Sequence, residues 1–547
     1  MAKTTTFPLR YSAYAISIAG LVISLPVTIW IDGGYVAPVI FAILTAVGTR
    51  DLVQRRHTIS RNYPIMANFR YLFESVGPEI RQYFIQSDTE ERPFSREQRA
   101  IVYQRAKDVL DKRPFGSQLS MYEEGFEWMS HSMAPTKITD SDFRIVIGKN
   151  CEKPYNASVF NISAMSFGSL SANAILALNT GARKGGFYHD TGEGSISRHH
   201  RQPGGDLVWE IGSGYFGCRN PDGTFSEEKF QKNATLDQVK MIEVKLSQGA
   251  KPGHGGILPG AKVSEEIAEA RGVEPGEDCI SPARHSAFST PIELMEFMDR
   301  LRQLSGGKPV GFKLAIGHPW EWFALVKAML KTGKKPDFIV VDGGEGGTGA
   351  APLEFINRLG TPMTEALLLV HNTLVGAHLR EDIAIGAAGK ITSAFNIART
   401  LALGADWCNS ARGYMFSLGC IQALNCHTGR CPSGVATQDP RRGNKLDVPL
   451  KSERVYNFHR KTLDALQNLL EASGLNHPSE LGPENIIRRV SKTEVHSYLE
   501  LFPFLEPGSL LKGQTGVAIY DKYWREADPG NFEPPRFIQE LRETKLR

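Results

Sequence analysis

Two apolar runs lie close to the beginning of the chain. The first extends over residues 12–31 and the second over residues 35–47, and neither contains a charged side chain. Asp32-Gly33-Gly34 separates the runs, and the arginines that flank their outer ends are Arg10, Arg50, Arg55 and Arg56. Apolar spans with basic residues on both outer flanks are typical of a helical hairpin with both ends in the cytoplasm. The pattern therefore predicts a transmembrane hairpin anchor over residues 1–50.

Other interpretations of these runs stay open. The second run is short for a full span and contains Pro38, which favours a tilted or re-entrant segment as one alternative. A cleaved signal peptide is another, although no small-residue cleavage signal follows Ile31. A buried hairpin of a soluble protein is the third, because apolar runs of this length also occur in protein cores.

Charged and proline-containing segments flank the central part of the chain. Residues 51–150 are rich in arginine, and a helical pattern from Arg96 to Lys112 opens with Ser95-Arg-Glu-Gln98, which has the form of a capping box. We predict that residues 51–150 are a helical linker region. Residues 441–547 contain helical patterns and several prolines, and they are predicted to be a C-terminal helical extension.

From about residue 151, short apolar runs alternate with helical stretches. The predicted strands are residues 159–165, 186–189, 241–246, 310–315, 338–341, 383–385 and 406–409. Strands that alternate with helices argue for parallel βαβ units. We predict an α/β fold, a (β/α)8 TIM barrel over residues 151–440 with one strand unassigned. A doubly wound sheet is the alternative, but the first strand lacks the Gly-x-Gly-x-x-Gly turn of that fold.

Composition narrows the classes of function. The formal net charge of +4 over 547 residues gives no push toward nucleic acid. Seven cysteines are an odd and sparse set, which argues against a disulfide framework and suits a reducing compartment.

Three cysteines, Cys420, Cys426 and Cys431, lie in one short loop, with a proline directly after the last. Thiolates gathered this closely usually hold a soft metal or an iron–sulfur cluster. Because three thiols are present, a cubane that lacks one iron fits better than a four-ligand cluster. A zinc site completed by His427 and three unrelated buried thiols are the alternatives.

The cysteine loop and its tail, Cys-Pro-Ser-Gly-Val-Ala-Thr-Gln-Asp-Pro over residues 431–440, resemble the three-iron, four-sulfur loop of glutamate synthases. The resemblance extends upstream to about Asn161. Further matching blocks are residues 163–171, 190–194, 248–256, 258–260 and 346–352. Together they resemble the FMN-binding synthase domain in its stand-alone form, the FMN-binding glutamate synthase family protein. The resemblance implies FMN and a [3Fe–4S] cluster as cofactors of the barrel.

Flavin mononucleotide needs a phosphate site, and barrels often bind phosphate with the loops after strands seven and eight. Those loops are predicted at residues 386–392 and 410–413. The candidate phosphate contacts are Gly389, Lys390, Arg412 and Gly413. Backbone amides would cradle the phosphate, and Arg412 would add charge. The alternative is that the glycines only make turns. The glycine-rich run 343–349 is expected to be a further flavin-side or substrate-side loop.

Two lysines are expected at the barrel mouth. Lys245 and Lys251 lie at and just beyond the end of a predicted strand, where an ammonium can stabilise a reduced flavin or bind a carboxylate. A lone lysine is more often a surface residue. In the resembled family both matching lysines lie at the flavin and 2-oxoglutarate site, which implies catalytic roles for both and a flavin contact for Lys245. The resemblance also implies that Glu193 orders the imine or ammonia, and that Gln248 and Ser166 contact the flavin.

Three positions depart from the family pattern. Glutamate synthases usually have an acid and an amide where this chain has His254 and Ile257, and the large enzymes have an arginine where it has Tyr215. Tyrosine lacks the full charge with which that arginine meets the keto-acid carboxylate. We therefore expect Tyr215, His254 and a replacement arginine, Arg219, in the substrate site. Arg284 and the cluster 198–201 are other candidates for the replacement.

Two parts of the large enzymes are not evident. The first cysteine is Cys151, so no N-terminal glutaminase cysteine is present, and no nicotinamide site stands out. The chain is expected to use free ammonia, an amine or a glutaminase partner as nitrogen source. Its electrons are expected to come from a ferredoxin or a flavoprotein reductase.

These features predict a membrane-anchored glutamate synthase-like oxidoreductase that depends on FMN and a [3Fe–4S] cluster. It would carry out the reductive amination of 2-oxoglutarate, or a similar keto acid, to glutamate, with electrons passing from the cluster to the flavin. The expected location is the inner (cytoplasmic) membrane, with the catalytic domain in the cytoplasm. A C–N oxidoreductase acting on an amine or an N-substituted amino acid and a non-catalytic membrane-bound electron relay are the alternatives.

Overall fold

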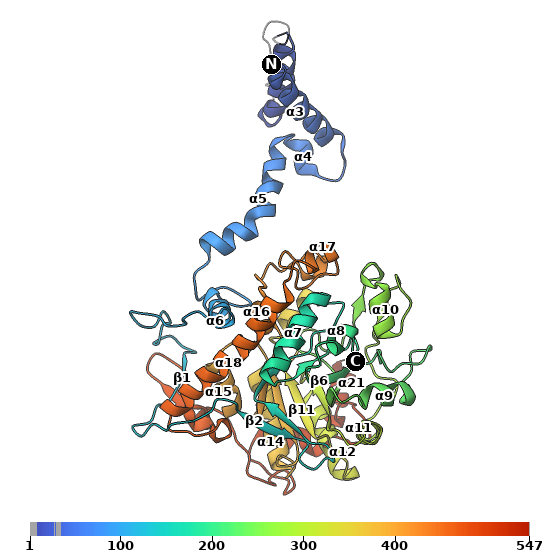
Figure 1. The fold of residues 1–547 in the computed structure, drawn as a ribbon, viewed down its shortest axis with the longest axis vertical. Helices are drawn as coiled ribbons and strands as arrows, with labels where there is room; N and C mark the ends of the chain where they lie inside the picture. Colours follow the sequence, from blue (N-terminus) through green and yellow to red (C-terminus); the bar gives the residue numbers. More distant parts are fainter. Residues whose placement is uncertain (1–7, 27, 29–33, 546–547) are drawn as a thin grey trace. The chain divides into compact units, whose positions relative to one another are not determined.

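The computed structural model describes residues 8–26, 28 and 34–545. The chain forms two units, residues 1–96 and residues 97–547 (Figure 1). This division splits the predicted linker 51–150, because its first two helices belong with the N-terminal hairpin and the residues after Arg96 belong with the barrel.

The N-terminal unit is a helical hairpin followed by two further helices. Its elements are η1 (Leu9–Tyr11), α1 (Ser12–Ser24), α3 (Val36–Val53), α4 (Thr58–Asn62), α5 (Met66–Ile80) and a π-helical turn, η2 (Arg81–Ile85). Small and hydroxyl side chains join α1 to α3. Tyr14 Oη lies 2.8 Å from Thr49 Oγ1, and Thr45 Oγ1 donates to Ser17 Oγ at 3.2 Å.

Among the described residues, α3 is the one helix long and apolar enough to cross a membrane, and α1 is shorter. The end of the first predicted run at Ile31 and the predicted turn residues Asp32 and Gly33 lie outside the described residues. The helical hairpin is therefore present in its described part, whereas its insertion into a membrane stays a prediction.

Eight parallel strands of the described chain close into a barrel. They are β4 (Phe160–Ile162), β5 (His189–Asp190), β6 (Leu207–Ile211), β7 (Val239–Lys245), β10 (Val310–Leu314), β11 (Phe338–Asp342), β12 (Ala384–Ala388) and β13 (Trp407–Ser410). β13 pairs with β4, with Asn409 opposite Asn161, and so closes the ring. The predicted (β/α)8 barrel is confirmed, and the strand that the sequence left unassigned is β6.

Two strands differ from their prediction for local reasons. β6 is buried at every position, and Glu210 interrupts its apolar pattern. β5 begins at His189 instead of Gly186, because Gly186 ends the preceding helix in the left-handed conformation, with φ of 65°.

Helices surround the barrel (Figure 1). They are α7 (Ala172–Gly185), α9 (Glu227–Ala234), α11 (Pro291–Leu304), α12 (Pro319–Thr332), α14 (Met363–Gly376), α15 (Ala394–Ala402), α16 (Arg412–Leu418) and α18 (Val448–Ala472). α18 packs along α7 and contacts α15 and α16. The predicted end of the barrel at residue 440 is therefore too early, because α18 belongs to the layer of helices around it.

The remaining elements lie outside the barrel strands. The helices are α6 (Arg96–Ala106), α8 (Arg198–Arg201), α10 (Glu265–Arg271), α13 (Leu353–Arg358), α17 (Pro440–Gly443), α19 (Tyr498–Leu501), α20 (Ala518–Glu526) and α21 (Arg536–Lys545). The strands are β1 (Glu127–Met129), β2 (Arg144–Ile147), β3 (Tyr155–Ser158), β8 (Ile257–Leu258), β9 (Cys279–Ile280), β14 (Ile486–Arg489) and β15 (Val495–Ser497). α6 ends six residues before Lys112 (112 − 106), and Asp108 just after it has a positive φ of 54°.

The linker and the C-terminal extension are not purely helical, as they were predicted to be. β1 of the linker region pairs antiparallel with β14 of the extension, and β15 completes a three-stranded sheet. Glu127 supports this sheet from the barrel side, because one of its oxygens accepts from Arg399 Nη1 at 2.9 Å and the other from Tyr498 Oη at 2.6 Å. The two predicted regions therefore fold together.

Candidate functional site

An ion pair lies at the carboxyl ends of the barrel strands, where barrel enzymes place their chemistry. Lys245, the last residue of β7, has its Nζ 2.6 Å from Oε2 of Glu193, which lies in the loop after β5. Gly212, just after β6, makes room for the pair, since a Cβ there would lie 2.9 Å from Glu193 Oε2. Three loops therefore meet at this pair, and both of its residues were predicted from the sequence.

The electrostatics of Glu193 are set by its neighbours. Burial alone would raise the pKa of its carboxyl, but the ammonium of Lys245, with Arg271 and Lys251, reverses the effect and lowers the pKa to about 2. Glu193 is therefore an ionised carboxylate at neutral pH and holds two lysines around it.

Lys251 joins this group from the loop after β7. Its side chain is buried, and its Nζ donates to the carbonyl oxygen of Gly255 at 3.3 Å. Burial lowers the pKa of Lys251, Glu193 raises it and Lys245 lowers it, so the net shift is downward. A lysine with a lowered pKa gives up its proton more readily than a surface lysine does.

Glycines lock the loop that carries Lys251. A Cβ on Gly249 would lie 1.8 Å from the carbonyl oxygen of Gly343, and one on Gly255 would lie 2.0 Å from that of Ser281. Asp342 Oδ2 also accepts from the Gly249 amide at 2.9 Å. The loop therefore has one packed position against the loop after β11, and the glycine-rich run 343–349 forms part of the mouth as predicted.

Gln248 and Ser166 lie on mouth loops too. Gln248 is half-buried on the Lys251 loop, and its carbonyl oxygen accepts from the Lys251 amide at 3.2 Å. Ser166 follows β4, and its Oγ lies 3.1 Å from Ser169 Oγ. A Cβ on Gly192 would lie 2.7 Å from the Ser166 amide nitrogen, so the loops after β4 and β5 touch.

The predicted phosphate contacts follow β12 and β13. Lys390 has a positive φ of 55°, next to Gly389, which faces the side chain of Met363. Arg412 Nη2 donates to the carbonyl oxygen of Glu345 at 2.7 Å. Burial lowers the pKa of Arg412 to about 10, against the opposing effect of Asp342 and Glu345. At Gly413, a Cβ would lie 2.5 Å from Ser410 Oγ.

Tyr215, which was expected to contact the substrate, has its hydroxyl bonded inside the fold. It is fully buried, and its hydroxyl accepts from the Ala287 amide at 3.0 Å and lies 3.1 Å from His285 Nδ1. His285 Nε2 in turn lies 2.9 Å from the carbonyl oxygen of Lys245. Tyr215 is therefore a supporting residue behind Lys245, because its polar atom is already used inside the fold.

Arg219 and His254 do not join the ion pair either. The Arg219 guanidinium lies 5.6 Å from the ring centre of Phe216, and the exposed His254 packs edge-on against Phe355 at 5.4 Å. The His254 backbone amide donates to the carbonyl oxygen of Lys251 at 3.4 Å. Within the part of the chain that the structure describes, neither the Arg219 nor the His254 side chain makes an ion pair with Glu193 or a hydrogen bond to the two lysines. Their predicted contact with substrate remains a prediction.

Other residues of the site were missed from the sequence. His285 carries no motif and lies about forty residues after Lys245, so only the fold brings them together. Arg271, at the end of α10, is buried and donates to the carbonyl oxygen of Phe167 at 3.1 Å. It also helps to lower the pKa of Glu193.

A buried charge cluster lies inside the barrel. Its buried members are Asp190 of β5, Glu210 of β6, Glu243 of β7 and Lys313 of β10, and the half-buried Asp342 of β11 is a further charged neighbour of Lys313. Lys313 Nζ binds Glu210 Oε2 and lies 3.8 Å from Glu243 Oε1. Oxygens of Asp190, Glu210 and Glu243 lie within 4.8 Å of one another.

The cluster retains protons near neutral pH. Burial and the charge of Glu210 raise the pKa of Asp190 to about 7. Burial and Asp190 raise the pKa of Glu243 well above its usual value. Like charges in a dry interior cannot all ionise. In the sequence, the cluster is visible only as single acidic residues within several separate strands.

Cys426, one of the three cysteines, lies beside the glycine-rich loop after β11. A Cβ on Gly349 would lie 3.0 Å from Cys426 Cβ. On the other side, Tyr103 Oη donates to the carbonyl oxygen of Cys420 at 2.5 Å. Burial raises the pKa of Cys420 to about 11. At Cys431, burial acts the same way, but hydrogen bonds from Ser433 and from backbone amides outweigh it and lower the pKa.

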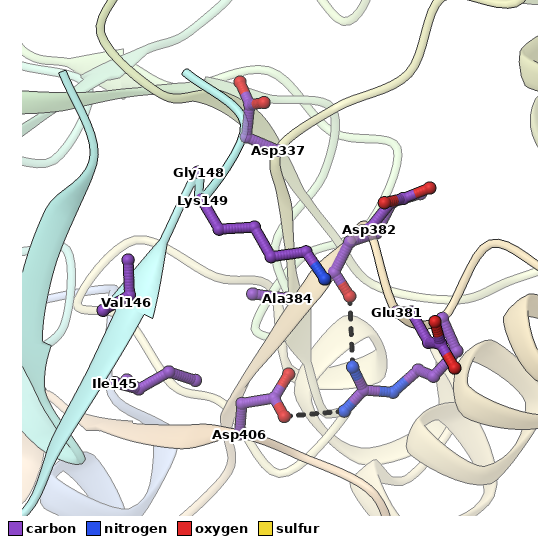
Figure 2. Close-up of a pocket in the computed structure, with 11 residues that line it drawn as sticks. Ile145, Val146, Gly148, Lys149, Asp337, Glu381, Asp382, Ala384 and Asp406 are labelled. Atoms are coloured by element: carbon purple, nitrogen blue, oxygen red, sulfur yellow. Dashed lines mark hydrogen bonds and ion pairs between the residues drawn. The ribbon is translucent and has the colours of Figure 1, made fainter. Parts of the chain in front are cut away.

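A small pocket of about 120 Å³ opens at the opposite, N-terminal end of the strands (Figure 2). Several of its charged groups form ion pairs: Arg380 with Asp406 at 2.8 Å, Asp382 with Lys335 at 2.6 Å and Asp337 with Arg302 at 3.0 Å. Residues at this end of a barrel usually serve stability. The ion pairs that line this pocket are therefore expected to stabilise the N-terminal end of the barrel.

Comparison with known proteins gives consistent matches. Residues 120–476 match the family model described as the conserved region in glutamate synthase. The glutamate synthase large subunit-like protein YerD of Bacillus subtilis (strain 168) is 40% identical over 481 residues, which cover 80% of this chain and 91% of YerD. The archaeal-type glutamate synthase (NADPH) of Thermotoga maritima is 33% identical over 338 residues, 61% of this chain and 63% of that protein.

Solved structures are more distant. The recombinant flavin-binding domain of baker's yeast flavocytochrome b2 aligns with 77% of this chain and 85% of its own, with a TM-score of 0.41 and 10% identity.

Proposed function

Because the chain belongs to the glutamate synthase family, we propose that it is a glutamate synthase-like oxidoreductase that reductively aminates 2-oxoglutarate or a similar keto acid, using FMN and a [3Fe–4S] cluster. The observation that carries this proposal is the group of Lys245, Glu193 and Lys251 at the barrel mouth. Two ammonium groups around one carboxylate suit a dianionic keto acid and a nitrogen nucleophile together.

The residues after β12 and β13 fit an FMN phosphate. Arg412 is a half-buried cation whose pKa is lowered by desolvation, and an anion beside it would relieve that cost. Backbone at Gly389, Lys390 and Gly413 would hold the remaining phosphate oxygens, and Gln248 and Ser166 would contact the flavin ring. When bound, FMN supplies the hydride-transfer chemistry.

The chain's own side chains have separable tasks in this proposal. Lys251 binds the keto-acid carboxylate and, with its lowered pKa, is suited to hold or release a proton at Nζ. Lys245 lies at the strand end on the flavin side and offsets negative charge there. Glu193, ionised and fixed by Lys245, accepts hydrogen bonds from ammonia or from the imine nitrogen. The glycines let these loops pack closely against neighbouring backbone.

The cysteine loop fits a cluster better than a single zinc ion. A zinc ion about 2.3 Å from each sulfur brings the sulfurs within roughly 4 Å of one another. In the described part of the chain, Cys420, Cys426 and Cys431 do not form a group of ligand atoms within 4.8 Å of one another. Thiolates on separate irons of a cluster lie farther apart. The amide donors around Cys431 also stabilise a thiolate, as they do at iron–sulfur sites.

The position of the cysteine loop supports an electron path. Cys426 packs against Gly349 of the same loop run that packs on the Lys251 loop through Gly343. Electrons from an external ferredoxin or flavoprotein reductase would therefore enter at the cysteines and pass to the flavin over a short route. Ammonia would enter free or from a glutaminase partner, and the hairpin of α1 and α3 would anchor the enzyme to the inner (cytoplasmic) membrane with the barrel in the cytoplasm.

One observation favours a second candidate, a C–N oxidoreductase acting on an N-substituted amino acid. The arginine that meets the keto-acid carboxylate in the resembled large enzymes is Tyr215 here, and its hydroxyl is bonded inside the fold. The two lysines would then carry the whole carboxylate recognition, which suits a substrate with fewer charges.

An anaerobic reoxidation screen separates the two functions. Purified full-length enzyme is reduced, then mixed with 2-oxoglutarate plus ammonium, with other keto acids plus ammonium, or with alkylamines in place of ammonium. We expect fast reoxidation and formation of glutamate with 2-oxoglutarate plus ammonium. Reoxidation only with an alkylamine, or reduction of the oxidised enzyme by an N-alkyl amino acid, would establish the second function instead.

A further inference from the structure

Helix α5 and the turn η2, at the end of the N-terminal unit, carry an apolar face that nothing else in that unit covers. The exposed apolar side chains of this face are Met66, Phe69, Leu72, Phe73, Val76, Ile80, Tyr83 and Phe84. Phe73 is 64% exposed and Phe84 is 84% exposed. A run of aromatic and aliphatic groups this exposed marks an interaction surface.

The face is a continuous stripe. At 3.6 residues per turn, the six side chains of α5 from Met66 to Ile80 fall within an arc of about 120°, and Tyr83 and Phe84 follow in the π-helical turn. Arg70, Glu74, Ser75 and Arg81 occupy the rest of the helix surface and are exposed as well. A helix with one apolar stripe and a charged opposite side has the pattern of helices that lie flat in a membrane–water interface.

The beginning of α5 is fixed at the end of the apolar hairpin. Asp51, in the last turn of α3, is buried, and its Oδ2 accepts from the Ile65 amide at 3.0 Å and from Asn68 Nδ2 at 2.6 Å. The stripe therefore starts where the span of α3 ends, and this is the level of the headgroups if α3 crosses a bilayer.

Charge at this level also suits a lipid surface. The segment between α3 and α5 carries the exposed arginines Arg55, Arg56 and Arg61, and no acidic side chain. Basic residues directly beside a span are attracted to anionic lipid headgroups.

We propose that α5 and η2 lie in the plane of the membrane, with the stripe from Met66 to Phe84 immersed in the headgroup and acyl boundary of a lipid bilayer. This inference rests on the proposed membrane anchor and extends it, since it gives the chain a second attachment that fixes where the linker to the barrel leaves the membrane.

The test places a nitroxide on each side of the helix in full-length protein. Phe73→Cys puts the label on the stripe, and Ser75→Cys puts it on the polar side two residues away. Both are reconstituted into vesicles of phosphatidylcholine and phosphatidylglycerol, with the labelled parent chain as background for the native cysteines. Accessibility to oxygen, which collects in lipid, is compared with accessibility to a water-soluble nickel chelate.

We expect the Phe73→Cys label to be reached by oxygen and shielded from nickel, and the Ser75→Cys label to show the reverse. Nickel access at Phe73→Cys equal to that at Ser75→Cys would place the stripe in water and overturn the proposal. A Phe73→Cys label that neither reagent reaches would place the stripe against protein, from a second copy or another part of the chain, and would overturn it as well.

Alkaline extraction of the same vesicles tests the membrane anchor separately from the interfacial position of α5. Release of the protein by alkaline carbonate would contradict the proposed membrane anchor. Retention of the protein, together with equal accessibility of the labels at both positions, would support the anchor and contradict only the interfacial position of α5. The keto-acid reoxidation assay on the same samples reports the catalytic function independently of both.

Discussion

Lys245 and Glu193 form an ion pair of 2.6 Å that joins the end of β7 to the loop after β5. A neighbouring residue supports each partner of the pair. The carbonyl oxygen of Lys245 lies 2.9 Å from His285 Nε2, and Arg271 supports the charge of Glu193. The pair is therefore arranged before any ligand arrives, as a preorganised electrostatic site requires.

The pair should make stability depend on acid pH. The pKa of Glu193 is about 2 in the folded chain, below its ordinary value of 4.5. A depressed pKa gives stability that is complete above 4.5 and is lost as the pH falls toward 2. At pH 3.5, one unit below the ordinary value, about 1.4 kcal/mol of this contribution is lost. We expect the free energy of unfolding, measured with urea at pH 6 and pH 3.5, to fall by about that much more in the parent than in Glu193→Gln.

Lys245→Met provides the matched comparison. Without the ammonium, burial is the largest remaining influence and it raises the pKa of Glu193, so the loss between pH 6 and pH 3.5 should shrink. Equal pH dependence in the parent and both variants would mean that the pair contributes nothing to folding.

Lys251→Ala should retain FMN and lose most turnover. Lys251 is buried in a loop that Gly249 and Gly255 hold against neighbouring backbone. Removing one preorganised charged group from such a site commonly lowers the rate about a hundred- to a thousand-fold. Stopped-flow reoxidation of the reduced enzyme by the accepted keto acid is the measurement, and flavin content is read from the absorbance spectrum.

Lys240→Ala is the control for that variant. Lys240 lies near the other end of β7, on the same strand as Lys245, and pairs with Asp206 at 3.6 Å. It should leave the rate within about twofold of the parent, because the N-terminal end of a barrel serves stability. A Lys251→Ala enzyme as fast as Lys240→Ala would return Lys251 to the class of ordinary lysines.

The barrel was predictable from the sequence and the interior was not. β11 is an apolar run from Phe338 to Val341, and the alternation of strands with helices indicates the fold class. β6 was missed, and its Glu210 pairs with Lys313, about a hundred residues later. Long-range ion pairs inside a barrel leave no local pattern.

The candidate site, like the barrel, could be predicted from the sequence only in part. Lys245, Lys251 and Glu193 were found because matching blocks mark their loops, and the structure brings them together. Tyr215 was placed in the substrate site because it fills an arginine position, but the fold turns its hydroxyl to Ala287. The position of Tyr215 along the chain therefore did not reveal the hydrogen bond that its hydroxyl makes.

The cysteine loop should bind about three irons per chain and give a three-iron EPR signal when oxidised. Cys426→Ser should abolish the signal, because it removes the ligand that packs beside Gly349. Cys151→Ser, at a thiol whose pKa burial raises to about 12, should retain it. Zinc without iron in protein purified anaerobically would contradict the cluster.

Removal of residues 1–96 should release a soluble catalytic unit that still carries flavin. The boundary is the one between the two units, and every residue proposed to bind FMN or the cluster lies after it. Full-length protein should sediment with membranes and resist alkaline extraction. Full-length protein found in the soluble fraction without detergent would show that the hairpin of α1 and α3 is not an anchor.

Lys313→Met should destabilise the barrel far more than loss of a surface lysine does. Lys313 is buried, binds Glu210 and lies 3.8 Å from Glu243, with Asp190 and Asp342 also in the cluster. Removing the one cation leaves buried carboxylates without a partner, and breaking a buried pair in this way costs about 3–5 kcal/mol.

Lys184→Met is the surface control, since Lys184 is half exposed in its pair with Glu453 and such pairs contribute less than about 1 kcal/mol. Urea unfolding of the catalytic unit gives both values. If Lys313→Met does not fold, Glu210→Gln tests the same idea with a smaller change, because it keeps the ammonium and removes one acid. The urea midpoint of Glu210→Gln should fall less than that of a variant that lacks the Lys313 ammonium. A Lys313→Met protein as stable as Lys184→Met would show that the cluster protonates fully and needs no cation.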